Sequence, residues 1–164
     1  MFPAALLASA ERLLADARAK GIKIVTAESC TGGLVAGLLT EIPGSSDVVE
    51  RGFVTYSNLA KEEMLGVSHD LLLAHGAVSA EVARAMATGA LKQARADLAV
   101  SVTGIAGPGG GTDDKPVGLV HFAAARGDRV IHRECRFGPI GRDHIRLEAV
   151  TTALQMLDLL LHPS

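Results

Sequence analysis

The stretch Thr26-Ala27-Glu28-Ser29-Cys30-Thr31-Gly32-Gly33-Leu34 joins two different hydrophobic patterns. A β-type run, Ile22–Val25, precedes it, and apolar residues at helical spacing begin at Leu34. The combined pattern predicts a strand that ends, and a helix that begins, within a few residues. Unpaired backbone N–H groups and the positive end of a helix dipole meet at such a junction.

Three hydroxyl or thiol side chains, Ser29, Cys30 and Thr31, stand at this junction. Gly32 and Gly33 would let a ligand approach the backbone closely, because they carry no side chain. The junction is therefore a candidate site for an anion, an oxyanion or a nucleophile. The structural alternative is a Ser/Thr helix cap followed by two glycines that ease a turn.

The composition narrows the class of protein. A chain of 164 residues with 48% hydrophobic content suits one globular domain over residues 1–164. Aromatic residues make up only 3% and the net charge is −2, which argues against a nucleic-acid partner. The start of the chain lacks a basic n-region, and no apolar run reaches the ~20 residues of a membrane span. We therefore expect a cytoplasmic protein without a membrane partner.

The remaining elements alternate between helical and strand patterns along the chain. The order of these patterns predicts an α/β fold, a three-layer α/β/α domain on a mixed, mostly parallel sheet of about five strands. The expected helices are 4–20, from Leu34, 58–65, from about 67, 79–96 and 141–161, and the expected strands are 22–25, 48–56, 98–102, 119–125 and 129–137.

The loop Thr103–Val117 is rich in glycine and proline and follows an expected central strand. If that strand and Ile22–Val25 are parallel, Thr103 and Gly104 lie at the same end of the sheet as Ser29, where α/β proteins bind ligands. Neither the P-loop nor the dinucleotide glycine pattern fits the loop. A long surface connection remains the structural alternative, although loops of this length in compact domains are often functional.

Tyr56 ends the second expected strand, and Lys61 follows five residues later. Together with Ser29 they could form a hydrolase site in which a partly neutral lysine removes the serine proton and the phenol assists. The structural alternative is an exposed helix lysine and a half-buried strand tyrosine.

Arg142 and Arg146 lie four residues apart at the start of the last expected helix, so they share one face and could clamp a carboxylate or phosphate. Salt-bridged surface arginines are the alternative. The six histidines have no metal-ligand spacing, so no metal site is predicted. Cys30 has no neighbouring histidine in sequence and is interpreted as a small buried residue.

Several motifs in order resemble the C-terminal domain of the competence/damage-inducible protein family CinA, over roughly residues 6–161. The resemblance implies the stand-alone form, without the molybdopterin-binding-like domain that precedes it in larger members. The motifs are 27–33 (AESCTGG), 52–58 (GFVTYSN), Lys61, 75–79 (HGAVS), 102–108 (VTGIAGP) and 115–118 (KPVG).

This resemblance implies an amidohydrolase that converts nicotinamide mononucleotide (NMN) to nicotinate mononucleotide and ammonia in pyridine nucleotide salvage, without a cofactor. The family's catalytic serine, tyrosine and lysine fall on Ser29, Tyr56 and Lys61. The ligand-binding arginine falls on Arg142, with Arg146 in reserve. The family also implies a homodimer or higher homo-oligomer.

Further substrate contacts are expected from Cys30, Thr31, Gly32, Gly33, Thr103 and Gly104. Backbone N–H groups in these two segments are candidates for holding the oxyanion. Two other functions stay open at this point: a non-catalytic nucleotide-binding protein of competence or damage responses, and an amidase with another substrate.

Overall fold

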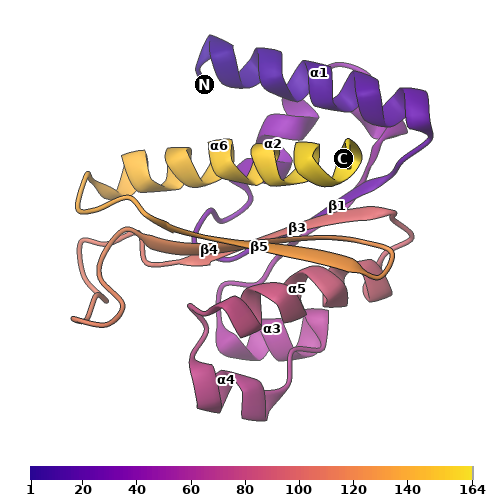
Figure 1. Ribbon diagram of the computed structural model, residues 1–164. Coiled ribbons are helices and arrows are strands. Elements are labelled where there is room, and N and C mark those ends of the chain that lie inside the picture. Colours follow the sequence, from indigo (N-terminus) through magenta and orange to yellow (C-terminus); the bar gives the residue numbers. More distant parts are fainter. Residues whose placement is uncertain (164) are drawn as a thin grey trace.

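The computed structural model describes residues 1–163 and contains a five-stranded sheet between two layers of helices (Figure 1). Both the three-layer architecture and the five strands confirm the prediction from sequence. The strands are β1 (Ile24–Glu28), β2 (Val49–Val54), β3 (Leu98–Gly104), β4 (Leu119–Arg126) and β5 (Arg129–Arg136). The helices are α1 (Ala4–Lys20), α2 (Leu34–Glu41), the 3₁₀ turn η1 (Ser45–Asp47), α3 (Asn58–Leu65), α4 (His69–His75), α5 (Ala80–Gln93) and α6 (Arg142–Leu161).

The strand order in the sheet is β2-β1-β3-β4-β5. β1 pairs in parallel with both β2 and β3, whereas β3–β4 and β4–β5 are antiparallel. The sheet is therefore mixed, as expected, and its parallel half contains the strand that leads to Ser29. The carboxyl ends of β1, β2 and β3 lie at one edge, which is the usual ligand side of an α/β sheet.

Each face of the sheet has its own apolar core. Helices α1, α2 and α6 cover one face and α3, α4 and α5 cover the other (Figure 1). Alternation along β1 sends Ile24 to the first core and Val25 and Ala27 to the second. By the same alternation, Glu28 belongs to the α2 side of the sheet and Ser29 to the α3 side.

Some element boundaries differ from the sequence prediction by a few residues. Helix α3 covers the expected residues 58–65, and its N-cap is Ser57, whose hydroxyl accepts a hydrogen bond from the Ala60 N–H. Helix α5 ends at Gln93 instead of about Ala96. Strand β2 runs only from Val49 to Val54, so Tyr56 lies in the loop before α3.

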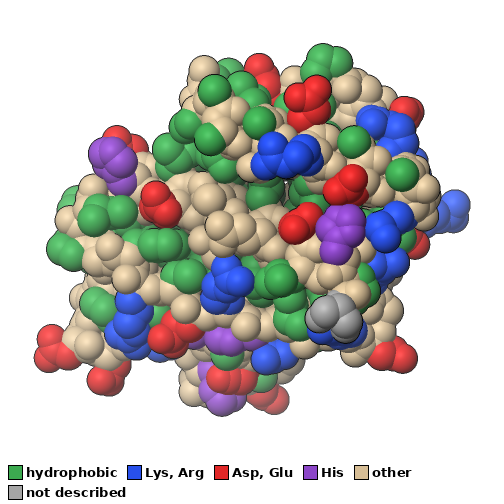
Figure 2. Space-filling view, turned by 45° about the horizontal axis from the view of Figure 1, so that its top comes forward, with side chains coloured by type: hydrophobic (Ala, Val, Ile, Leu, Met, Phe, Trp, Pro, Cys, Tyr) green, Lys and Arg blue, Asp and Glu red, His purple; other side chains and the backbone are tan. Residues whose placement is uncertain are grey.

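Charged side chains of both signs are interspersed on the face shown in Figure 2, without a large block of one sign. Such a distribution agrees with the small net charge of −2. Within residues 1–163, none of the helices combines the length and the apolar character that a membrane crossing would need.

Candidate active site

The turn between β1 and α2 places Ser29 directly beyond the last residue of a fully buried strand. The Ser29 N–H continues the β ladder to the Val102 carbonyl at 2.9 Å, which fixes the backbone of Ser29 against β3. Gly32 and Gly33 both have positive φ, 58° and 103°, and Gly33 is the N-cap of α2. The glycines are therefore needed for the left-handed backbone of the turn.

The side chains of Ser29 and Lys61 meet beneath this turn. The Lys61 amine lies 2.9 Å from Ser29 Oγ, and the two residues are 1% and 8% exposed, respectively. Lys61 Nζ also lies 2.8 Å from the Thr55 carbonyl oxygen and 3.3 Å from that of Tyr56. The lysine is thus a buried residue with three oxygen neighbours, and the alternative of an exposed helix lysine is wrong.

Burial lowers the pKa of the Lys61 amine to about 8. An amine with this pKa is partly neutral near physiological pH. Neutral lysine has two N–H donors and one lone pair, and the three oxygen neighbours fit this inventory. In the ammonium form the amine donates to all three oxygens; in the neutral form the Thr55 and Tyr56 carbonyls accept its two N–H bonds, which leaves the lone pair for the Ser29 hydroxyl.

Arg142, the first residue of α6, contacts two loops near the site. Its guanidinium donates to the Gly107 carbonyl at 2.7 Å and to the Tyr56 hydroxyl at 3.0 Å. The loops that follow β2 and β3 and the start of α6 therefore converge, although they are distant in sequence. Arg142 is exposed, so its guanidinium remains accessible to an anionic ligand.

Tyr56 contributes to the site through two different atoms. Its backbone carbonyl faces the Lys61 amine, whereas its hydroxyl is in contact with Arg142. The side chain is 62% exposed. The predicted assistance of the phenol in proton transfer remains a prediction, because it needs the hydroxyl to leave Arg142 and turn toward Ser29.

Arg146 is hydrogen-bonded to the backbone of the turn between β1 and α2. Its side chain donates to the carbonyls of Cys30 at 3.1 Å and Thr31 at 3.2 Å. Arg146 is partly buried with these contacts, whereas Arg142 is exposed, so the geometry favours Arg142 over Arg146 as the arginine for a ligand. Cys30 is buried, and burial raises the pKa of its thiol to about 12, which makes it a poor nucleophile.

Glu28 is a site residue that sequence reasoning missed. It is 1% exposed and accepts hydrogen bonds from the Thr31 hydroxyl at 2.6 Å, the Val35 N–H at 2.9 Å and the Ala36 N–H at 3.1 Å. Its carboxylate thus caps α2, and it takes the place at the helix N-terminus that the sequence suggested for an external anion. The available signal was an acidic residue at the end of an apolar strand, directly before the turn.

Thr103 and Gly104 hold the loop that follows β3. The Thr103 hydroxyl donates to the Ala77 carbonyl at 2.9 Å and so ties β3 to the segment before α5. A Cβ at Gly104 would lie 2.6 Å from a methyl group of Val120, so only glycine fits this strand pairing. Their expected contacts with a substrate remain predictions.

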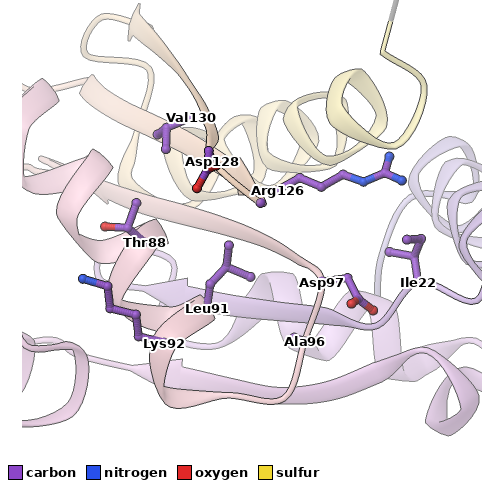
Figure 3. A pocket seen from close by; sticks show the side chains of 10 residues that line it. Ile22, Thr88, Leu91, Lys92, Ala96, Asp97, Arg126, Asp128 and Val130 are labelled. Carbon is purple, nitrogen blue, oxygen red and sulfur yellow. The ribbon is translucent and has the colours of Figure 1, made fainter.

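A large hollow lies at the other end of the sheet from Ser29 (Figure 3). It is lined by side chains from α5, from the segment before β3 and from the β4–β5 turn, including Lys92, Asp97 and Arg126. The Arg126 guanidinium donates to the carbonyls of Leu160 and Leu161, so it stabilises the end of α6. Neither Ser29 nor Lys61 lines this hollow, so a choice of site by cavity size alone would miss them.

One group of possible metal ligands occurs among the described residues. Asp16, Asp158 and His162 bring three ligand atoms within 4.8 Å of one another at the end of α6. Arg142 begins the same helix, and its 20 residues span about 30 Å. This group is thus remote from the Ser29 turn.

Taken together, these features define an α/β protein with a buried serine and a buried lysine in contact at the carboxyl end of its parallel strands. The chain belongs to the CinA C-terminal domain family, whose model matches residues 7–161.

Curated relatives include two kinds of protein. The nicotinamide-nucleotide amidohydrolase PncC of Escherichia coli K12 is 56% identical over 142 residues, which cover 85% of each chain. A CinA-like protein of Mycobacterium marinum is 54% identical over 147 residues, and these are 89% of this chain but 33% of the relative. The chain therefore spans about a third of the longer type of relative.

Solved structures agree with the fold over nearly the whole chain. The competence/damage-inducible protein CihA of Agrobacterium tumefaciens has a TM-score of 0.97 at 55% identity and 99% coverage of both chains. A CinA superfamily protein of Escherichia coli has a TM-score of 0.91 at 33% identity, covering 98% of this chain and 94% of that one.

Proposed function

We propose that this protein hydrolyses the carboxamide of nicotinamide mononucleotide to nicotinate mononucleotide and ammonia. The observation that carries the proposal is the 2.9 Å contact between the Lys61 amine and Ser29 Oγ in a buried environment. Further support comes from the relative named nicotinamide-nucleotide amidohydrolase, which is 56% identical over 142 residues.

The first chemical step is attack of Ser29 Oγ on the carboxamide carbon. The serine proton passes to the neutral Lys61 amine, and the carbonyl oxygen becomes an oxyanion. The Lys61 ammonium then gives its proton to the amide nitrogen, the C–N bond breaks and ammonia leaves. The product of this half-reaction is an ester between Ser29 and the nicotinoyl group.

Water completes the reaction by attack on this ester. Lys61 accepts a proton from the water, the bond to Ser29 Oγ breaks, and the proton returns to the serine oxygen. The product leaves the serine as a carboxylic acid, which gives its proton to the released ammonia or to the solvent and so becomes nicotinate mononucleotide. Atoms and charge balance over the two halves without a metal ion or a redox partner.

The oxyanion requires hydrogen-bond donors that are not already bonded to another group of the protein. Within residues 1–163, the N–H groups of Val35 and Ala36 are bonded to Glu28, and that of Gly32 is bonded to the Ser29 carbonyl. The N–H groups of Cys30, Thr31 and Gly33 have no backbone or side-chain oxygen partner in this part of the chain. We assign these groups of the turn, those of Thr31 and Gly33 among them, as the candidate oxyanion donors, each of a type typically worth ~3 kcal/mol.

Arg142 is assigned to the phosphate of the substrate. It is exposed and is held near the site by Gly107 and Tyr56. A phosphate matches the fork of a guanidinium, and such charge-assisted bonds are the strong ones. The Tyr56 hydroxyl orients Arg142 before the substrate binds. When the phosphate takes the place of this hydroxyl on Arg142, the hydroxyl becomes available for proton transfer.

The decisive experiment is an ammonia-release assay with NMN beside nicotinamide, nicotinamide riboside and glutamine. We expect NMN to be the preferred substrate and the Ser29→Ala protein, verified as folded by circular dichroism, to release no ammonia above background. Calorimetric titration of Ser29→Ala with NMN should still show binding. Turnover of NMN near the wild-type rate by folded Ser29→Ala would exclude the serine mechanism, and binding without turnover by the wild type would favour a non-catalytic protein.

A further inference from the structure

The carboxylate of Glu28 is the buried charge closest in sequence to the proposed nucleophile. Glu28 ends β1 and Ser29 follows it, so their side chains extend to opposite faces of the sheet. The carboxylate is 1% exposed, and three groups donate to it: the Thr31 hydroxyl and the N–H groups of Val35 and Ala36. A buried charge with this many donors is held in one position, because each lost bond would leave a buried polar group unpaired.

The three donors come from both sides of the glycine pair. Thr31 precedes Gly32 and Gly33, whereas Val35 and Ala36 belong to the first turn of α2. One carboxylate therefore ties the residue before the flexible glycines to the helix after them.

Arg146 binds backbone carbonyls of the same turn, whereas Glu28 binds hydroxyl and N–H groups. Its side chain donates to the Cys30 and Thr31 carbonyls, while Glu28 accepts from the Thr31 hydroxyl. Thr31 is thus fixed through both its backbone carbonyl and its side chain. Two positive-φ glycines follow Thr31, and without these ties the turn would have many backbone conformations available.

We propose that Glu28 is a positioning residue for the amide hydrolysis. By fixing the 30–33 turn, its carboxylate keeps Ser29 Oγ within reach of Lys61 and aims the Thr31 and Gly33 N–H groups at the forming oxyanion. The inference rests on the proposed function, in which Ser29 is the nucleophile. It differs from a purely structural cap, because a cap would stabilise α2 without setting the reactivity of Ser29.

The test compares Glu28→Gln with Glu41→Gln, which removes one carboxylate from an exposed position at the other end of α2. The glutamine amide turns a donor toward the Thr31 hydroxyl or the helix N–H groups, so at least one of the three bonds is lost. Misplacement of a reacting group by about 1 Å can cost ~100-fold in rate. We expect Glu28→Gln to lower kcat with NMN by about 10- to 100-fold with KM changed by less than about 3-fold, and Glu41→Gln to match the wild type.

A second readout does not depend on the substrate. The rate at which phenylmethanesulfonyl fluoride modifies Ser29, followed by mass spectrometry, should fall in Glu28→Gln by a factor similar to that for kcat. If the wild type is modified at Ser29 but releases no ammonia from NMN, the proposed function fails while this readout still decides the role of Glu28. Equal modification rates and equal kcat in folded Glu28→Gln and wild type would overturn the proposal.

Thr31→Val provides a milder variant in case Glu28→Gln does not fold. It removes one donor from the carboxylate and leaves the charge in place. We expect a smaller fall in kcat and in modification rate than for Glu28→Gln, and Thr31→Ser, which keeps the hydroxyl, should recover most of it. A lower melting temperature with unchanged kcat in Thr31→Val would assign Glu28 to helix capping alone and would overturn the proposal.

Discussion

The amine of Lys61, a buried residue of α3, lies 2.9 Å from the hydroxyl of Ser29 in the β1–α2 turn. Because burial lowers the pKa of Lys61 to about 8, the fraction of neutral amine rises as the pH increases through this value. We expect kcat/KM for NMN to increase about tenfold per pH unit below pH 8 and to level off above it. Lys61→Met should lose this dependence and fall by about 10²- to 10⁴-fold.

The measurement is a set of initial rates of ammonia release between pH 6 and 9.5 in buffers of constant ionic strength. Lys92→Met, an exposed lysine of α5, is the matched control and should keep both the rate and the pH dependence. A wild-type profile that is flat from pH 6.5 to 9 would show that Lys61 does not act as the base.

The two arginines of α6 should separate substrate binding from turn geometry. Arg142→Gln removes the accessible guanidinium, so KM for NMN should rise by about 10- to 100-fold, the range of one or two charge-assisted hydrogen bonds. Arg146→Gln removes the contacts to Cys30 and Thr31 and should mainly lower kcat.

Nicotinamide riboside, which lacks the phosphate, provides the comparison for these arginine variants. Its turnover, however slow, should change little in Arg142→Gln. If Arg142→Gln weakened the turnover of NMN and the riboside equally, Arg142 would contact another part of the substrate.

The residues of the candidate site could be named from sequence, but their contacts could not. Ser29, Lys61 and Arg142 each belong to patterns with recognisable chemistry, and the parallel strands predicted which edge they share. The burial of Lys61 enters the sequence analysis only through the hydrolase hypothesis, because a lysine in a short helix is exposed in most proteins. It follows from the approach of α3 to α5, a tertiary contact that leaves little trace in the local pattern.

Glu28 shows a different limit of sequence reasoning. An isolated acidic residue in an apolar strand is usually explained by a strand end that reaches solvent. Here Glu28 is buried and the α2 N–H groups satisfy it, so the helix N-terminus is occupied by the chain itself. Whether a helix N-terminus is vacant depends on which side chains fold back onto it, and that depends on the relative placement of strand and helix.

The contact between α3 and α5 can be tested through Gly89. A Cβ at this position would lie 2.0 Å from the Leu65 carbonyl oxygen, so the backbone of α3, which carries Lys61, must move away in Gly89→Ala. We expect a loss of about 1–3 kcal/mol in the free energy of unfolding and a lower kcat in the folded protein.

Gly37→Ala in α2 is the matched control for Gly89→Ala. Its Cβ would meet only a ring atom of Phe2 at 3.9 Å, so the change should stabilise the helix by about 0.5–1 kcal/mol and keep the activity. Urea unfolding with rate measurements on both variants provides the test. If Gly89→Ala had wild-type stability and activity, the close approach of α3 and α5 would not determine the position of Lys61.

The histidine pair on β4 and β5 predicts a loss of stability in acid. His121 Nδ1 and His132 Nε2 lie 2.8 Å apart, and the two rings are stacked. Burial lowers the pKa of both histidines. The charge of His132 lowers the pKa of His121 further, and the charge of Arg84 does the same for His132. Glu134 and Glu81 oppose these effects, but the net direction for both residues is downward.

A histidine whose pKa is lowered by folding binds fewer protons in the folded state than in the unfolded state. Its stabilising contribution is complete above the unfolded pKa of ~6.5 and is lost as the pH falls below that value. The melting temperature should therefore decrease between pH 7.5 and 5.5 more steeply in the wild type than in His132→Gln, which removes one ring of the pair. His144→Gln, an exposed histidine of α6, should follow the wild-type curve. Parallel curves for wild type and His132→Gln, measured by differential scanning calorimetry, would show that the pair does not couple folding to protons.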